Sequence, residues 1–211
     1  MPYITKIERQ KRHSKRWSIF IDNQYAFGVD EEIIQRLGLQ EDQIVDEKEL
    51  KKIIFEEEKR KAREYALNLL SIRPRTKKEL EQRLKRKEFE TEIISKVISR
   101  LEEVGLIDDE KFARLWTESR LASKPMGPNR LKEELWQKGI SPEIIEESLK
   151  EFTNKDEQIG IAKELVKRKT RQYVSLSPEV MKRRLMGFLS RRGFSYEIIK
   201  EVLRNETTDP P

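Results

Sequence analysis

The side chains with the clearest capacity for chemistry in this sequence are clustered lysines and arginines, which bind phosphate and carboxylate oxygens. One cluster lies within residues 73–87 and another within residues 183–192, and acidic residues are few in both. Rows of such cations would bind an anionic partner with an affinity that falls as salt rises. The cations that we assign to this role are Arg73, Arg75, Lys77, Arg83, Arg183, Arg184, Arg191 and Arg192.

Four more cations flank the segment Pro125-Met126-Gly127-Pro128: Arg120, Lys124, Arg130 and Lys132. Because proline restricts the backbone, this bend would present the four charged groups from a fixed frame. The competing interpretation of each single cation is an ordinary solvated helix or loop. Only their recurrence along the chain favours a binding surface.

Groups for catalysis or metal binding are missing. The sequence has no cysteine, no phosphate-binding glycine loop and no zinc or calcium motif, and His13, its one histidine, lies in a basic run typical of a loop. Asp108 and Asp109 could bind Mg²⁺, but capping of a helix start explains the pair better. We therefore expect a protein that is not an enzyme and has no metal or cofactor.

Composition limits the kind of fold that can position these side chains. Of the 211 residues, 40% are charged and 36% hydrophobic, which suits slender helical layers better than one thick core. The net charge is +6, and residues 1–16 and 159–204 are basic whereas residues 17–158 are net acidic. No apolar run approaches the length of a membrane span and no secretory signal is present, so we expect a cytoplasmic location.

A repeat runs through the chain with offsets of 51 and 54 residues. Its spacing predicts two amphipathic helices joined by a short turn in each copy. A further helical stretch precedes each pair, so each repeat is a three-helix unit. The repeated apolar positions are Leu80, Leu84, Phe89, Ile93, Ile94 and Ile98, then Leu131, Leu135, Ile140, Ile144, Ile145 and Leu149, then Leu185, Leu189, Phe194, Ile198, Ile199 and Leu203.

The turn residues agree with this repeat. Gly139 and Gly193 stand where a helix C-terminus takes positive φ, but Glu88 occupies that place in the first copy and must adopt a strained or different turn. Trp116 and Trp136 fall at helical spacing among apolar neighbours, which favours packing over ligand contact.

The first 45 residues do not show the helical pattern of the repeats. Residues 4–9, 17–21 and 25–29 are short β-prone runs, with a tight turn at residues 22–24 and a short helix at residues 30–37. The predicted fold is mainly α: an elongated, curved row of three tandem three-helix repeats after a small β-containing extension. The predicted extension covers residues 1–45. The three repeats cover residues 46–109, 110–156 and 157–205, and a long helix leads into the first of them. Residues 206–211 are predicted to be a disordered tail.

Several motifs resemble the RecX family. They cover nearly the whole chain, and their order and spacing match as well as their residues; the one departure is Glu88, where the family has glycine. The matching motifs are Ala66-Leu67, Arg73-Pro74-Arg75-Thr76, Glu79-Leu80, Gly105-Leu106-Ile107-Asp108-Asp109, Phe112-Ala113, Ser119-Arg120, Lys124-Pro125, Gly127-Pro128, Arg130-Leu131, Glu134-Leu135 and Lys138-Gly139-Ile140.

The resemblance implies a regulator that binds RecA and lies in the helical groove of the RecA–DNA filament. Such a protein suppresses the recombinase, ATPase and co-protease activities of RecA, and some members also bind single- or double-stranded DNA. We expect a monomer with no membrane partner. The alternative is a sequence-tolerant DNA-binding protein made of helix-turn-helix-like units without a RecA partner, and charge alone does not separate the two.

Overall fold

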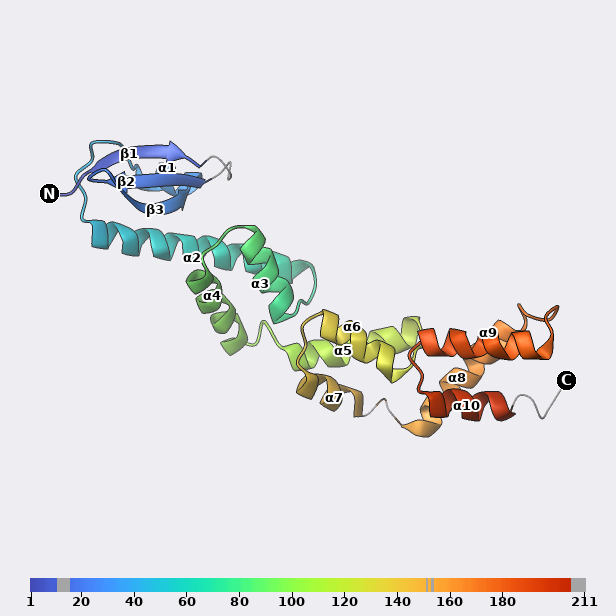
Figure 1. Cartoon of the computed structure of the whole chain (residues 1–211). Helices are drawn as coiled ribbons and strands as arrows, with labels where there is room; N and C mark the ends of the chain where they lie inside the picture. The colour runs from blue at the N-terminus through green and yellow to red at the C-terminus, as the bar shows by residue number, and fades with distance from the viewer. Residues whose placement is uncertain (11–15, 151, 153, 206–211) are drawn as a thin grey trace. The chain divides into compact units, whose positions relative to one another are not determined.

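The structure, a computed structural model, describes residues 1–10, 16–150, 152 and 154–205, and within them three β-strands precede ten α-helices (Figure 1). His13 and the predicted tail at residues 206–211 lie outside the described residues. The chain forms two compact units, one of residues 1–73 and 80–106, the other of residues 74–79 and 107 onward.

The first unit opens with an antiparallel sheet in the order β1-β2-β3. Its strands are β1 (Ile4–Arg9), β2 (Arg16–Ile21) and β3 (Gln24–Asp30). Asp22 and Asn23 connect β2 to β3 with φ of 47° and 65°. Positive φ at both central residues matches the right-handed twist of a hairpin, and Asp and Asn tolerate it best after glycine. The tight turn predicted here is confirmed.

Two helices cover the sheet. Asp30 caps α1 (Glu31–Leu37) by accepting a hydrogen bond from the Glu32 backbone N–H at 3.0 Å. The sheet packs its apolar face on α1 and on the first half of α2 (Glu47–Ile72), which contributes Leu50 and Ile54 to the shared core. A three-stranded sheet needs such cover because its strands alone bury too little apolar surface.

The three predicted repeats are all present. The second half of α2 is followed by α3 (Lys77–Arg86) and α4 (Thr91–Glu103). Two further groups follow in the second unit: α5 (Asp109–Ser123), α6 (Pro128–Gln137) and α7 (Pro142–Lys150), then α8 (Lys155–Thr170), α9 (Pro178–Arg191) and α10 (Tyr196–Asn205). None of the described helices has the length and apolarity of a bilayer span.

The repeated apolar positions form the cores of these helix groups. All of them are buried except Phe89 and Ile144, which are half-buried. Ser141 caps the start of α7, accepting from the backbone N–H of Ile144 at 3.4 Å. The expectation of three-helix repeats after a small β-containing extension is therefore confirmed.

Within the second unit, the α9–α10 turn sits on the start of α6. The backbone N–H of Gly127 donates to the carbonyl of Arg192 at 2.8 Å, and that of Asn129 donates to Gly193 at 3.1 Å. A Cβ on Gly193, which has φ of 85°, would lie 2.3 Å from the backbone nitrogen of Arg130. Glycine at position 193 thus serves both the turn and the contact between consecutive repeats.

The start of α3, which belongs to the second unit, receives the α6–α7 turn in the same way. The Thr76 hydroxyl donates to the Lys138 carbonyl at 2.7 Å and accepts from the backbone N–H of Glu79 at 3.2 Å. The side chains of Lys138 and Glu79 form an ion pair at 2.8 Å. A Cβ on Gly139 would lie 2.2 Å from the Lys78 side chain. The same turn-on-helix joint therefore occurs twice.

The first repeat's turn has a different neighbour, which explains why glycine is dispensable there. Glu88 has φ of 65°, so the turn keeps the left-handed shape that the repeat predicts. Its carbonyl accepts a hydrogen bond from Arg16 of β2 at 3.0 Å. A non-glycine residue meets the conformational requirement of this position at a cost of about 1–2 kcal/mol.

That cost predicts a difference between two substitutions. Glu88→Gly should give a free energy of unfolding about 1 kcal/mol higher than Glu88→Ala, since both remove the carboxylate and only glycine relieves the positive φ. Urea denaturation of the two variants, followed by circular dichroism, measures the difference. Equal stability of the two variants would contradict a strained turn.

Candidate partner-binding surfaces

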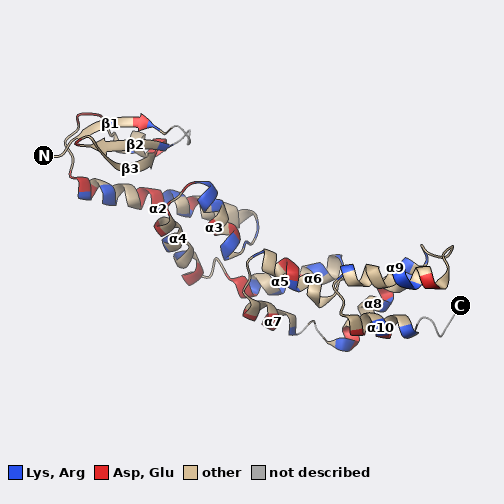
Figure 2. Cartoon of the chain, in the orientation of Figure 1, with Lys and Arg blue, Asp and Glu red and all other residues tan. Residues whose placement is uncertain are grey.

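The predicted binding cations differ in their exposure to solvent and in whether they form ion pairs within the chain. Arg83 on α3, Lys124 after α5, Lys132 on α6, and Arg183 and Arg191 on α9 are exposed. Among the residues that the structure describes, these five side chains form no ion pair. Figure 2 marks the positions of Lys and Arg in blue along the ribbon, including those on α3 and α9. A charge without an internal partner keeps its full attraction for an external anion.

Two cations beside the proline bend are held inward by Glu134, a side chain that is 15% exposed. The Nε of Arg120 lies 2.8 Å from its Oε2, and the Nε of Arg130 lies 3.7 Å from its Oε1. Arg130 also pairs with Glu133 at 2.7 Å. In the part of the chain that the structure describes, Lys124 and Lys132 thus have no carboxylate partner, whereas the two arginines beside them do.

Trp116 and Trp136 differ, although we predicted packing for both. Trp116 is half-buried: it stacks on Phe112 at 5.8 Å, and its indole N–H donates to Glu134 at 3.3 Å. Arg120 and Lys138 lie 4.4 and 4.1 Å from its ring centre. Trp136 is 66% exposed, so the packing prediction is wrong for it. It lies on the outer face of α6, because Leu131 and Leu135 fill the inner face.

The cations between α2 and α3 are less available than the sequence indicated. Arg75 is only 8% exposed, among the few buried charged residues. Arg73 and Lys77 are exposed, yet both have interactions within the chain. A buried guanidinium requires internal partners, which suggests that Arg75 supports the fold.

Asp108 and Asp109 act as helix caps in this structure. Asp108 accepts from the backbone N–H of Lys111 at 2.8 Å, at the start of α5. Asp109 accepts from the backbone N–H of Lys77 at 3.0 Å, at the start of α3. Each carboxylate meets a helix N-terminus, where negative charge is favoured. Within the described residues, no group of three or more His, Asp or Glu could hold a metal ion.

The third repeat combines its cations with aromatic rings, a feature that the sequence did not reveal. Lys169 lies 5.3 Å from the ring centre of Tyr173 and 5.7 Å from that of Phe188. Arg184 lies 5.8 Å from Tyr173, and Arg192 lies 5.3 Å from Phe188. These residues come from α8, the following loop and α9, so only the folded chain places them together.

Arg192 also has a structural role. Its Nη1 donates to the Pro125 carbonyl at 3.0 Å, which adds a side-chain bond to the joint between the second and third repeats. Of the four predicted arginines between residues 183 and 192, Arg183 and Arg191 are therefore the two without a ring or carbonyl partner in the described chain.

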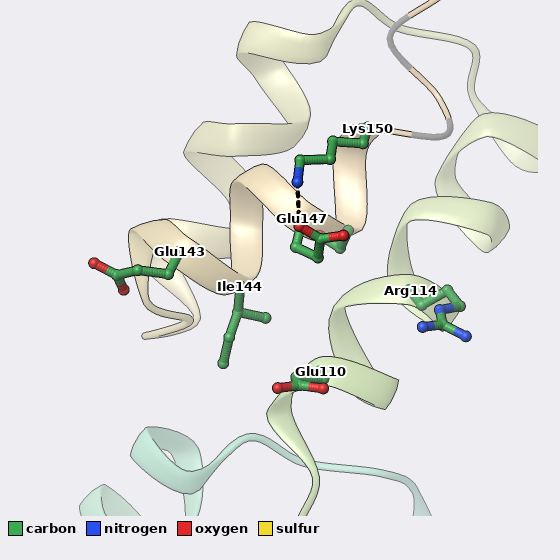
Figure 3. Close-up of a pocket in the computed structure, with 7 residues that line it drawn as sticks. Glu110, Arg114, Glu143, Ile144, Glu147 and Lys150 are labelled. Atoms are coloured by element: carbon green, nitrogen blue, oxygen red, sulfur yellow. Dashed lines mark hydrogen bonds and ion pairs between the residues drawn. The ribbon is translucent and has the colours of Figure 1, made fainter.

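A pocket of about 360 Å³ between α5 and α7 contains none of the predicted cations (Figure 3). Its walls include Glu110 and Arg114 from α5, and Glu143, Glu147 and Lys150 from α7. Lys150 pairs with Glu147. Hydrogen bonds from its own backbone N–H and from Ser141 hold the pKa of Glu143 below its usual value. The pocket is thus chemically distinct from the basic surfaces.

Family models match most of the chain. Residues 2–46 match the regulatory protein RecX N-terminal domain. Residues 62–101, 108–149 and 156–203 match the first, second and third three-helix domains of RecX. These three ranges coincide with the three helix groups of the structure.

Curated relatives give the same assignment. The regulatory protein RecX of Bacillus cereus strain G9842 is 39% identical over 216 aligned residues, which cover 99% of this chain and 80% of the relative. That of Bacillus subtilis strain 168 is 34% identical over 203 residues, covering 96% and 76%. Both carry the name of a regulatory protein and not of an enzyme.

Two crystal structures share the fold. One of a regulatory protein RecX superposes with a TM-score of 0.70 at 27% identity and covers 97% of this chain and 100% of its own. RecX from Lactobacillus salivarius superposes with a TM-score of 0.67 at 27% identity and covers 72% and 99%. Four domain matches in order, relatives above one-third identity over nearly the full length and a shared fold lead to one conclusion: this chain belongs to the RecX family of regulatory proteins.

Proposed function

We propose that this protein acts in the cytoplasm as a monomer that binds RecA and the RecA–DNA filament in the helical groove. Binding there inhibits the recombinase, ATPase and co-protease activities of RecA. The observation that carries the proposal is the match to RecX over all four domains. The RecX name connects the chain to RecA; the fold supplies the means of contact.

The exposed cations offer a physical route to this binding. Lys124, Lys132, Arg183 and Arg191 come from two consecutive repeats of the second unit and have no internal carboxylate among the described residues. Each contact with a phosphate or an acidic side chain contributes modestly, and several acting together give useful affinity. The net charge of +6 favours approach to an anionic filament.

The ATPase activity of RecA tests the proposal. Purified protein, added in stoichiometric excess to RecA on single-stranded DNA, should suppress DNA-dependent ATP hydrolysis and strand exchange. An unchanged ATPase rate would contradict the proposal. A pull-down of purified RecA by the tagged protein, with and without nuclease, then shows whether contact requires DNA.

A DNA-binding role without RecA is the second candidate, and the aromatic and basic side chains of the third repeat favour it. Stacking on Tyr173 or Phe188, together with phosphate contacts from the α9 arginines, would suit a sequence-tolerant DNA binder. That role predicts a steep fall of DNA affinity with salt and no effect on RecA's ATPase at matched DNA occupancy.

A further inference from the structure

Glu58 interrupts the buried face of α2. The buried residues of this helix recur at mostly four-residue spacing, and Glu58 is the only charged one. Leu50 and Ile54 before it belong to the core under the sheet, whereas Ala62 and Ala66 follow in the part of the helix that builds the first repeat. Its side chain is 2% exposed. A carboxyl therefore lies where the sheet's core ends and the first repeat begins.

Arg16 connects this carboxyl to two other elements. Its Nη2 lies 3.2 Å from the Oε1 of Glu58 and donates to the Gly28 carbonyl in β3 at 2.9 Å. Its Nη1 donates to the Glu88 carbonyl in the turn before α4 at 3.0 Å. One guanidinium thus holds the sheet, α2 and the α3–α4 turn together, and Glu58 is the charged partner that faces it.

Of the other charged groups around Glu58, two carboxylates oppose its ionised form, and the attraction of Lys61, which favours that form, is the smallest of the effects on its pKa. Asp30 at the end of β3 and Glu90 before α4 are carboxylates that repel a second negative charge. Lys61, one turn along α2, is engaged by Asp30 at 2.8 Å and Glu32 at 2.6 Å. Neither oxygen of Glu58 accepts a hydrogen bond of good geometry within the described residues.

Burial is the largest effect and raises the pKa of Glu58 to about 7, against the opposing attraction of Arg16. An ordinary solvated glutamate titrates near 4.5. When the sheet is packed on α2, Glu58 therefore stays protonated between about pH 4.5 and pH 7. When the sheet is released from α2 and Glu58 meets water, the carboxyl is ionised over the same pH range.

We propose that Glu58 is a proton-controlled latch, which keeps the N-terminal sheet seated on α2 and the α3–α4 turn while its carboxyl is neutral and weakens that seating when the carboxyl ionises. The inference is independent of the RecA partner. Because the seated form binds the proton more tightly, seating is strongest below pH 4.5 and weakens as pH rises toward 7 and beyond. From pH 6 to pH 8 the equilibrium constant for seating, which is the ratio of seated to released sheet, should fall about tenfold.

Hydrogen exchange of the full chain tests the latch. Release uncovers the part of the sheet's apolar face that packs on Leu50 and Ile54 of α2, so amides in residues 16–30 should exchange through the released state. After correction for intrinsic exchange rates, their protection should fall about tenfold between pH 6 and pH 8. Glu58→Gln should abolish this fall, because an amide does not titrate. Glu56→Gln, which alters a 57%-exposed carboxylate of the same helix, should behave as wild type.

A second measurement on the wild-type chain does not depend on any variant folding. Carboxyl carbon-13 shifts followed through a pH titration should show Glu58 titrating near 7, far above the exposed glutamates. Titration of Glu58 at or below 4.5 would overturn the latch, as would the same pH-dependent loss of protection in Glu58→Gln and wild type.

Discussion

Gly193→Ala is expected to lower the free energy of unfolding of the second unit by about 3 kcal/mol, from positive φ and steric overlap together. A Cβ at this position meets the backbone nitrogen of Arg130 at 2.3 Å and its Cα at 2.9 Å. A backbone segment that begins a helix cannot move aside as a flexible side chain can. The start of α6 must therefore shift away from the turn and lose the bonds to Arg192 and Gly193.

Gly105→Ala is the matched control. Gly105 has φ of 69°, but among the described residues beyond its two chain neighbours no atom lies within 4 Å of where its Cβ would be. Alanine there carries only the conformational cost, about 1–2 kcal/mol. Urea denaturation with circular dichroism, analysed separately for the two units by hydrogen exchange, measures both changes. Equal costs at the two glycines would show that the joint contributes nothing beyond φ.

Reversing the charge of four exposed cations in the second unit is the functional prediction with the largest expected effect. The combined variant Lys124→Glu, Lys132→Glu, Arg183→Glu and Arg191→Glu should lose inhibition of RecA's ATPase at concentrations where the wild type inhibits fully. At 0.1 M salt each lost phosphate contact lowers affinity about tenfold. The same variant should show a shallower dependence of filament binding on salt, because fewer counterions are released.

The control carries an equal charge change elsewhere. Lys48, Lys51, Lys52 and Arg63 are exposed on α2, and their replacement by glutamate changes the net charge by the same amount. If affinity depended on net charge alone, both variants would fail equally. Retained inhibition in the first variant would refute the assignment of these cations to the binding surface.

The helical repeats could be predicted from the sequence alone, because their apolar spacing needs no long-range information. Nearly every repeated position is buried, and Gly139 and Gly193 adopt positive φ as their turn position requires. The hairpin at Asp22 and Asn23 was predictable for the same reason: local residue types select the turn. At these positions the local backbone preference and the burial of the side chains favour the same structure, so the order of residue types along the chain was enough to predict it.

Tertiary structure decided which cations face outward and which are held within the chain. Sequence spacing put Arg120, Lys124, Arg130 and Lys132 beside one bend, but only the packing of α5 against α6 brings Glu134 within 2.8 Å of the Arg120 Nε. The exposure of Trp136 likewise depends on which face of α6 meets the rest of its repeat.

Glu58 is the clearest case of information that the sequence withholds. In the printed chain it is one acidic residue among many on a charged helix. Its raised pKa arises because folding buries it and brings the charges of residues 16, 30 and 90, distant along the chain, close to it. Charge interactions depend on distance and on the exclusion of water, and the chain acquires both only when it folds. The basic clusters were therefore visible from residue types, whereas the free, paired and buried members of those clusters were set by the fold.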